Sequence, residues 1–382
     1  MALTDGKNHA MKLTIERAQL LKSLAHVQSV VERRNTIPIL SNVKLEARPG
    51  SLSLNATDMD LDFVETVTAD VARPGATTAP AHTLFEIVKK LPDGSQVEID
   101  HSAEDGLLTL RSGRSRFSLA CLPVEDFPVL SGGELPHRFT LSAAELKTLI
   151  DRTRFAISTE ETRYYLNGIY LHAATGAEGD VLRAVATDGH RLARVEVTLP
   201  EGAAGMPGVI VPRKTVGEIY KLIGETDAEI TVSLSETKLR FAFGDAILTS
   251  KLIDGTFPDY ERVIPADNDK YLDADVKVFA SAVDRVSAIS TEKSRAIKLS
   301  LEKGTVKLSA SSPENGTAEE ELEAQYESTP LEIGFNSRYL LDILAQVEGE
   351  TARFAMADAA SPTVVRDVSD AGAIYVLMPM RV

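Results

Sequence analysis

The residues best suited to chemistry in this sequence are carboxylates and one histidine, and they occur in two short, similar stretches. The first stretch holds Asp58, Asp60 and Asp62, and the second holds Asp188 and His190. Alternating carboxylates on a strand share one face and could bind a hard cation. An Asp–His pair could exchange a proton with a substrate. Both patterns raise the hypothesis of an enzyme, for instance a metal-dependent hydrolase.

The surroundings of both stretches favour a structural interpretation instead. The first has neither the spacing nor the glycine of an EF-hand loop, so we predict a solvated strand edge. Asp188 and His190 flank Gly189, which indicates a turn, and no nucleophile motif lies beside them. The sequence also contains no P-loop and no dinucleotide-binding glycine motif. We therefore expect no catalytic residue, no metal site and no cofactor.

Two other stretches each allow two interpretations. The segment 111–116 carries three arginines that could contact phosphate, but Gly113 between alternating strands equally suits a hairpin turn. Tyr164 and Tyr165, next to Arg163, could stack on nucleic acid or could begin a strand that enters the core.

The chain ends in an apolar segment, Tyr375 to Val382, that contains Met378 and Met380 on either side of Pro379. Methionine side chains adapt to varied apolar partners. The segment could seal the last domain, or it could line a groove for partner peptides.

These stretches are positioned by a threefold internal repeat. The segment 55–61 returns as 185–192, and 40–45 returns as 166–171 and 294–299, at a period of roughly 130 residues. Each unit begins with a strand and an amphipathic helix, continues through alternating strands and contains a second helix. The pattern predicts an α+β fold in which each domain packs two helices on antiparallel sheets.

The helices are predicted from apolar residues at three- and four-residue spacing. In the first helix of the third unit, the expected buried stripe consists of Val278, Phe279, Val283 and Val286. Glycine- and proline-bearing segments mark the domain boundaries. We predict an N-terminal extension and three domains, at 1–10, 11–135, 136–267 and 268–382.

The composition is that of a globular protein with two or three domains, since 43% of its 382 residues are hydrophobic and 25% are charged. Cys121 is the single cysteine, so no internal disulfide can form, which fits a reducing compartment. No apolar run is long enough to span a membrane. We therefore expect a cytoplasmic protein.

The net charge of −15 opposes nonspecific binding to nucleic acid by the molecule as a whole. The predicted helices nevertheless carry roughly twice as many Lys and Arg as Asp and Glu, while the rest of the chain is acidic. If the helices share one face, that face could meet a phosphate backbone without reading its sequence. The alternative is that exposed helix faces simply favour basic residues.

Several ordered motifs together resemble the bacterial sliding clamp, the beta subunit family of DNA polymerase III. The motifs are Thr187-Asp-Gly-His-Arg-Leu192, Arg163-Tyr-Tyr-Leu-Asn-Gly168, Val211-Pro-Arg-Lys214, Thr249-Ser-Lys-Leu252, Phe257-Pro-Asp-Tyr260, Arg111-Ser-Gly-Arg-Ser-Arg-Phe117 and Met378-Pro-Met-Arg381. The resemblance covers residues 11 to 382. It implies three similar clamp domains that form half of a closed ring, completed by a head-to-tail homodimer with a seam near Ala288 and Ile289.

The resemblance also implies a function as an accessory subunit that has no catalytic site. A clamp of this family encircles duplex DNA without sequence preference and tethers the replicative polymerase, which raises processivity by keeping the polymerase concentrated at the template. An ATP-driven clamp loader places it on DNA. The polymerase alpha subunit, the loader, other polymerases and repair proteins bind it through short peptide motifs.

The family's functional residues carry over to matching positions in this sequence. Its DNA contacts carry onto Arg34, Tyr164 and Tyr165. Its partner-peptide pocket carries onto Leu166, Thr187, Gly189, His190, Arg191, Leu192, Pro258, Arg262, Val263, Asn336, Tyr339, Val376, Met378, Pro379, Met380 and Arg381. Departures from a well-studied relative are Ser294 and Pro362 near the pocket, and His82 and Glu160 at DNA-contacting positions.

Two alternatives to a clamp are a metal-dependent hydrolase and a scaffold that binds peptides but not DNA. The internal repeat argues against the hydrolase. The position of Asp188 is occupied by Asp58 in the first unit but by Ser312 in the third, as expected for a turn that supports the fold.

Overall fold

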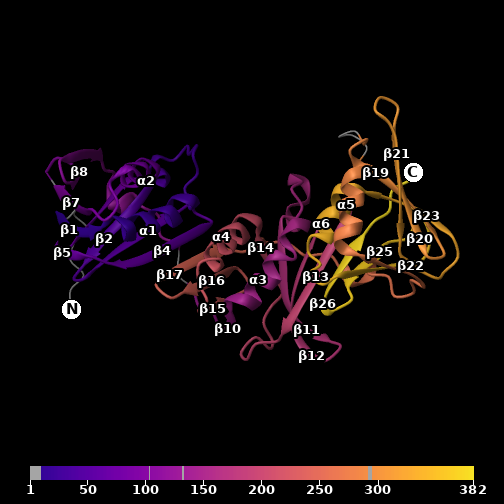
Figure 1. Cartoon of the computed structure of the whole chain (residues 1–382). Helices are drawn as coiled ribbons and strands as arrows, with labels where there is room; N and C mark the ends of the chain where they lie inside the picture. Colours follow the sequence, from indigo (N-terminus) through magenta and orange to yellow (C-terminus); the bar gives the residue numbers. More distant parts are fainter. Residues whose placement is uncertain (1–9, 103, 131–132, 291–294) are drawn as a thin grey trace. The chain divides into compact units, whose positions relative to one another are not determined.

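The computed structural model describes residues 10–102, 104–130, 133–290 and 295–382 (Figure 1). They form two compact units: the chain up to Ala144 with Gly217–Leu252, and Glu145–Val216 with Ile253–Val382. The chain passes between the units within helix α3 (Ala143–Asp151), within helix α4 (Arg213–Ile223) and after strand β17 (Ala246–Lys251). Both units combine antiparallel sheets with helices, which confirms the predicted α+β class.

The first unit contains helices α1 (Arg17–Val30) and α2 (Ala81–Lys90), together with the short 3-10 helices η1 (Pro38–Ser41) and η2 (Val124–Asp126). One sheet has the strand order β5 (Asp70–Arg73), β1 (Met11–Glu16), β7 (Gln96–Ser102), β8 (Leu107–Ser112), β9 (Ser115–Ala120). The other has the order β10 (His137–Ser142), β15 (Glu229–Leu234), β16 (Lys238–Phe243), β17, β4 (Leu61–Thr68), β3 (Ser51–Thr57), β2 (Asn42–Arg48), β6 (Gly75–Pro80). Because β17 pairs with β4, strands from two repeats form one sheet.

The core of the first unit lies under α1. Apolar residues at three- and four-residue spacing give this helix one buried stripe, formed by Leu20, Leu24, Val27 and Val30. The helix packs on α2, β3 and β4. The strands bury alternate residues, as in β3, where Leu52, Leu54 and Ala56 are fully buried.

The second unit contains helices α5 (Val276–Ser287) and α6 (Ser337–Leu344), with the 3-10 helices η3 (Arg154–Ala156), η4 (Glu161–Leu166) and η5 (Tyr260–Val263). One sheet has the order β14 (Val209–Pro212), β11 (Gly168–Gly176), β12 (Gly179–Thr187), β13 (Arg191–Thr198), β26 (Asp370–Leu377), β25 (Thr363–Asp367), β24 (Thr351–Met356), β18 (Lys270–Asp275), β22 (Gln325–Tyr326). The other has the order β21 (Gly316–Glu323), β20 (Thr305–Ser312), β19 (Ala296–Glu302), β23 (Leu331–Asn336). The pairing of β13 with β26 again joins two repeats.

Helix α5 corrects one detail of the predicted core. Val278 is 52% exposed, so its assignment to the buried stripe is wrong. The stripe contains Val276 and Ala282 in its place, beside Phe279, Val283 and Val286. The helix begins at Asp275, whose carboxylate accepts the N–H of Val278 at 2.9 Å. Packing of the helix against α6, β20 and β21 buries this stripe and leaves Val278 facing outward.

The repeated sequence stretch forms the same turn in successive units. In the first unit the Thr57 hydroxyl donates to the carbonyl of Leu61 at 2.9 Å. The Asp58 carboxylate accepts the N–H groups of Asp60 and Leu61 at 2.9 and 2.7 Å. Met59, at the tip, has a positive φ of 78°.

In the second unit Thr187 and Asp188 repeat this pattern. The Thr187 hydroxyl donates to the Arg191 carbonyl at 2.7 Å, and the Asp188 carboxylate accepts the N–H groups of His190 and Arg191 at 2.9 and 3.0 Å. In the third unit the Ser312 hydroxyl accepts two N–H groups in the same way, each at 3.3 Å. The repeated stretch is therefore a structural turn, in which the aspartate or serine side chain accepts hydrogen bonds from backbone N–H groups.

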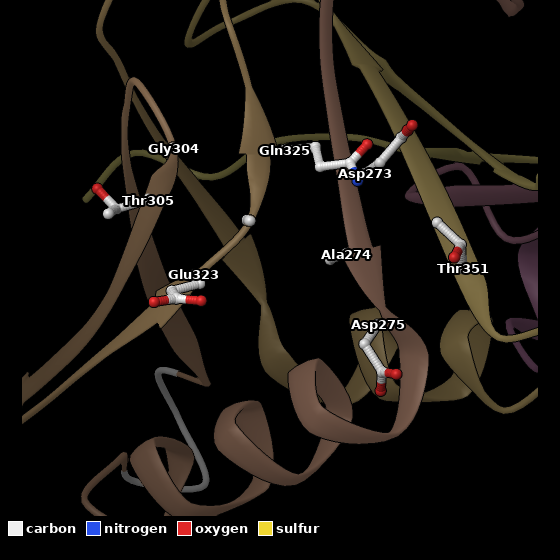
Figure 2. Close-up of a pocket in the computed structure, with 9 residues that line it drawn as sticks. Asp273, Ala274, Asp275, Gly304, Thr305, Glu323, Gln325 and Thr351 are labelled. Atoms are coloured by element: carbon white, nitrogen blue, oxygen red, sulfur yellow. The ribbon is translucent and has the colours of Figure 1, made fainter.

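A hollow of about 560 Å³ lies beside β18 and the first residue of β20 (Figure 2). Its lining includes Asp273, Asp275 and Glu323. Asp273 already accepts two hydrogen bonds from the Arg353 guanidinium, at 2.7 and 2.6 Å, and Asp275 caps α5. The hollow contains no residue of the predicted sites. Within the part of the chain that the structure describes, no helix is long and apolar enough to cross a membrane.

Candidate functional site

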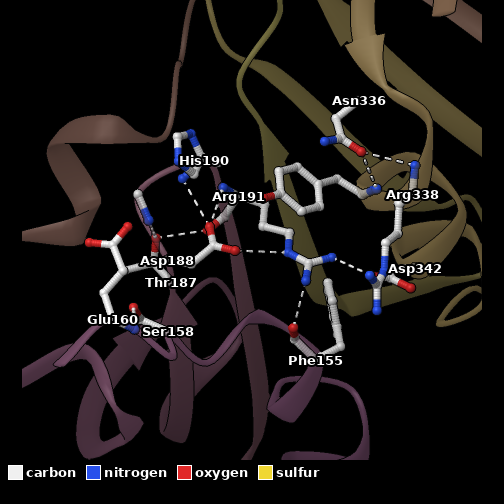
Figure 3. Close-up of polar contacts among 12 residues, drawn as sticks. Phe155, Ser158, Glu160, Thr187, Asp188, His190, Arg191, Asn336, Arg338 and Asp342 are labelled. Carbon is white, nitrogen blue, oxygen red and sulfur yellow. Dashed lines mark hydrogen bonds and ion pairs between the residues drawn. The ribbon is translucent and has the colours of Figure 1, made fainter. Parts of the chain in front are cut away.

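Arg191 lies at the centre of the predicted peptide pocket and is held on three sides (Figure 3). Its Nε donates to Asp188 Oδ2 at 3.2 Å, its Nη2 to the Phe155 carbonyl at 2.9 Å, and its Nη1 to Asp342 Oδ2 at 2.5 Å. The Arg191 side chain is only 10% exposed. Its guanidinium therefore joins β13, η3 and α6, and it does not stand free at the surface.

Two aromatic rings lie beside this guanidinium. Its carbon is 4.3 Å from the ring centroid of Tyr339 and 5.1 Å from that of Phe155, which are cation–π distances. The His190 ring stacks near Tyr339, with centroids 6.1 Å apart and planes inclined by 23°. Asn336 caps α6 by accepting the Tyr339 N–H at 3.3 Å. Tyr339 and His190 together form an aromatic wall.

The C-terminal segment returns along this turn. The Met378 N–H donates to the His190 carbonyl at 2.9 Å, and the Met380 N–H donates to the Gly334 carbonyl at 2.7 Å. A Cβ on Gly334 would lie 2.7 Å from the Met380 carbonyl oxygen, so only glycine allows this approach. The segment thus pairs with the outer edge of β23 at Gly334, while the Met378 side chain stays 38% exposed.

The apolar members of the predicted pocket divide into a buried and an exposed group. Leu166, Leu192 and Val376 belong to one buried cluster, which also contains Phe257 and Tyr260. Pro258 and Val263 are exposed, the latter by 50%, and Arg262 is paired with Asp259 at 2.7 Å.

Tyr260 anchors the segment that carries the exposed residues Pro258 and Val263. The His172 Nε2 lies 2.8 Å from the Tyr260 hydroxyl, to which Arg183 Nη1 also donates at 3.3 Å. Burial lowers the pKa of His172 and raises that of Tyr260. Tyr170 stacks on Phe257 with centroids 4.9 Å apart. The structure therefore brings together predicted pocket residues from β13, α6 and the C-terminal segment, and Tyr260 of η5 joins the same buried cluster as Leu192 and Val376.

The predicted DNA contacts occur in both units. Arg34 is exposed in the loop after α1, in the first unit. Tyr164 and Tyr165 lie in η4 of the second unit, so the interpretation of this stretch as a strand is wrong. Tyr164 is 53% exposed and meets the Tyr165 ring edge-on at 5.7 Å, whereas Tyr165 packs against the core.

The positions that depart from the family relative make contacts within the chain. His82 Nδ1 lies 2.8 Å from Gln28 Oε1, and Glu160 accepts a hydrogen bond from Arg163 at 2.8 Å. The Pro362 carbonyl accepts a hydrogen bond from Asn268 at 3.0 Å. Ser294 lies outside the described residues.

The three carboxylates of the first stretch do not share a strand edge, so that prediction is wrong. Asp58 caps the turn, and the exposed Asp60 pairs with Lys251 at 3.0 Å. Asp62 lies in β4, where burial raises its pKa to about 6. A hydrogen bond from Asn55 lowers this pKa, but by less than burial raises it. The described residues contain no group of three or more His, Cys, Asp or Glu arranged to hold a metal ion.

The arginine-rich segment 111–116 is a hairpin between β8 and β9. Ser112 pairs with Ser115, and Gly113 has a positive φ of 56°, which confirms the turn interpretation. Strand β9 is the edge of its sheet, and its Arg116 is exposed.

Phe155, Tyr260 and Asp342 also contribute to the site, although the sequence did not predict them. Asp342 follows Tyr339 by three residues on α6, a spacing that places both on one helix face and could have indicated it. Phe155 contributes both its backbone carbonyl and its ring, and neither contact belongs to a sequence motif.

The two joined sheets and the repeated turns are those of a clamp built from three similar domains. The chain matches the DNA polymerase III beta subunit family in its N-terminal domain over residues 11–131, its central domain over 140–259 and its C-terminal domain over 261–381. The chain belongs to this family, the beta sliding clamps.

Similar proteins match this chain along nearly its whole length. The beta sliding clamp of Caulobacter vibrioides is 56% identical over 97% of this chain and 100% of its own, and that of Escherichia coli K12 is 40% identical with the same coverage. A crystal structure of the sliding clamp from Bartonella birtlesii bound to griselimycin is 52% identical, covers 98% of this chain and 100% of its own, and has a TM-score of 0.95.

Proposed function

We propose that this chain forms a ring around duplex DNA and tethers the replicative polymerase, so that synthesis becomes processive. The observation that carries this proposal is the match to all three beta-subunit domains, in order, along nearly the whole chain. The three domains are proposed to occupy 11–135, 136–267 and 268–382, after an N-terminal extension of residues 1–10. Binding without sequence preference requires a basic surface rather than base contacts.

The charge distribution supports such a surface. The six α-helices of the described chain carry eleven Lys or Arg and six Asp or Glu, whereas the whole chain has 41 and 56. The proposed DNA contacts are these helices together with Arg34, Tyr164 and Tyr165. Tyr164 has an exposed ring of the kind that stacks on nucleotides.

Ring closure is proposed to come from a head-to-tail homodimer. Strand β9, with Arg116, and strand β21, with Glu319 and Glu321, are edge strands of opposite charge in different sheets. Two such edges can pair across a subunit seam and satisfy their free backbone groups. Ala288 and Ile289 directly follow α5, which packs on β21, and they would lie near this seam.

Partner proteins, namely the polymerase alpha subunit, the clamp loader, other polymerases and repair proteins, are proposed to bind the peptide site through short extended motifs. The exposed Pro258, Val263 and Met378 would anchor apolar side chains, and the aromatic wall would flank them. We also propose this site for griselimycin, which the Bartonella birtlesii clamp binds. Replacing Val263 with Asp should then weaken griselimycin binding measured by calorimetry.

The protein is proposed to act in the cytoplasm as an accessory subunit with no catalytic centre of its own. Both Asp188 and Asp58 accept backbone N–H groups in matching turns, a role that needs no substrate. The scaffold and hydrolase alternatives are less well supported than a clamp.

The test is retention on DNA after loading by the cognate loader and ATP. Nicked circular plasmid should retain the protein, and the same plasmid after linearisation should release it, because a ring slides off free ends. Equal retention on both forms would instead indicate ordinary surface binding and contradict the proposal. Hydrolase activity that EDTA abolishes would support the enzyme alternative.

A further inference from the structure

Asp342 lies in the second turn of α6, three residues after Tyr339, and its carboxylate contacts the nearly buried charge of Arg191. The Arg191 side chain is 10% exposed, and the Asp342 side chain is 35% exposed. Their Nη1–Oδ2 distance is 2.5 Å, and the pair is a charge-assisted hydrogen bond (Figure 3). The pair joins α6 to the turn that begins β13.

The two carboxylates around Arg191 have different tasks. Asp188 Oδ1 accepts the N–H groups of His190 and Arg191, so Asp188 is needed for the turn itself. The Asp342 carboxylate takes no part in the N-cap of α6, which Asn336 provides. A change at Asp342 can therefore alter the Arg191 guanidinium without removing the cap of either element.

The guanidinium in turn fixes the aromatic wall. It lies over the Tyr339 ring at 4.3 Å, and His190 stacks near the same ring. An arginine held by a carboxylate presents a fixed flat face for stacking, whereas a released one samples several rotamers. Ordering a binding surface before the ligand arrives raises affinity, because binding then costs less entropy.

We propose that Asp342 is a positioning residue of the partner-peptide site, which sets the wall of Tyr339 and His190 through Arg191. This inference rests on the proposed function of the site. It also changes the role of Arg191: its N–H groups bind Asp188, Phe155 and Asp342 within the chain, and the peptide meets the wall that this residue orders.

The experiment measures griselimycin binding to the full-length clamp by isothermal calorimetry. Asp342→Asn should weaken binding by about tenfold, the loss expected when one charge-assisted hydrogen bond stops ordering the site. Asp342→Glu keeps the charge and should recover binding to within about threefold. Asp267→Asn removes an equal charge from an exposed position and serves as the matched control.

A spectroscopic signal separates positioning from mere stability. The ring-proton resonance of His190, observed with 13C-labelled histidine, carries the ring-current shift of Tyr339. It should move toward its random-coil value in Asp342→Asn and return in Asp342→Glu. Unchanged affinity and an unchanged His190 signal in Asp342→Asn would overturn the inference, as would a loss that follows only the unfolding temperature.

The same measurements distinguish failure of the proposed site. If the unsubstituted clamp does not bind griselimycin, or if Val263→Asp binds it as well as the unsubstituted clamp does, the site assignment fails and this inference fails with it. If Val263→Asp weakens binding but Asp342→Asn does not, only the inference is overturned.

Discussion

At the scale of single residues, several buried charged side chains of this clamp hold parts of the fold together. Arg183 shows the principle, because this 6% exposed arginine binds Glu196, Glu261 and the Tyr260 hydroxyl at once. Removing one member of such a group would leave a buried charge without its partner, which costs more than the pair contributes. Residues that look catalytic in the sequence can therefore be structural.

Asp62 is the exception, because its carboxylate is buried at a cost. Its pKa is raised from 3.8 to about 6, chiefly by burial, with Asn55, Lys44 and Arg240 acting in the opposite direction. Between about pH 4 and about pH 6 the folded state keeps a proton that the unfolded state has released, so stability falls as pH rises through this window. Above about pH 6 this loss of stability no longer changes with pH.

We expect Asp62→Asn to raise the free energy of unfolding at about pH 8 by about 1–2 kcal/mol, because the amide carries no charge to desolvate. The gain should shrink toward pH 4. Urea unfolding at both pH values measures it, and Asp60→Asn, on an exposed neighbour, is the control. A gain of equal size at both pH values would contradict the assigned pKa.

At the scale of elements, the repeated turn shows how one backbone shape accepts different residues. Gly189 and Met59 occupy equivalent tips with φ of 88° and 78°. Glycine adopts this left-handed region without strain, whereas a residue with a Cβ does not. The hydrogen bonds of the flanking threonine and aspartate are strong enough to impose it on methionine.

Substitutions at the two tips should therefore have opposite signs. Met59→Gly should stabilise the protein by about 0.5 kcal/mol, since relief of strain slightly exceeds the entropy gained by the unfolded chain. Gly189→Ala should destabilise it by about 1–2 kcal/mol. Its Cβ would also lie 2.6 Å from the Arg163 Nη1. Chemical unfolding tests both, and two changes of the same sign would refute the equivalence of the turns.

Gly205→Ala provides a control for the contact with Arg163. Gly205 has a φ of 75°, and a Cβ there meets nothing within 4 Å. Gly205→Ala therefore measures only the free-energy cost of placing a residue with a Cβ at a positive φ. The excess cost of Gly189→Ala over Gly205→Ala measures the displacement of Arg163.

At the scale of the whole molecule, continuity between repeats comes from sheets. β17 pairs with β4 and β13 pairs with β26, so adjacent repeats share backbone hydrogen bonds. Among the described residues, the edge strands β9 and β21 each pair with a neighbouring strand on one side only. Exposed edges favour association with another strand, and the proposed dimer would pair them.

Reversing a charge on one edge should open the proposed ring. Arg116→Glu should weaken dimerisation by about tenfold, because like charges would then face each other across both seams. Glu321→Arg in the same chain should restore part of the affinity. Sedimentation velocity over a range of concentrations measures the dimer dissociation constant.

Arg48→Glu makes the same charge change in β2 and should leave dimerisation unchanged. If Arg116→Glu and Arg48→Glu behave alike, the seam does not use β9. The outcome bears on ring closure alone, since neither residue belongs to the peptide site.

The sequence by itself determined the features that short segments encode. The alternation of strands, the stripe of α1 and the turn at 187–192 follow from periodic burial and from hydrogen bonds between near neighbours. The error at Val278 shows the limit, because three- and four-residue spacing allows more than one rotation of a short helix. The packing of α5 against α6 and β20 chose between them.

Only the tertiary structure decided which distant groups meet. Arg191 and Asp342 are 151 positions apart, and their contact depends on the pairing of β13 with β26 and on the docking of α6. The burial that raises the pKa of Asp62 depends likewise on the pairing of β17 with β4. Such contacts are set by the packing of many residues at once, so no local pattern in the chain records them.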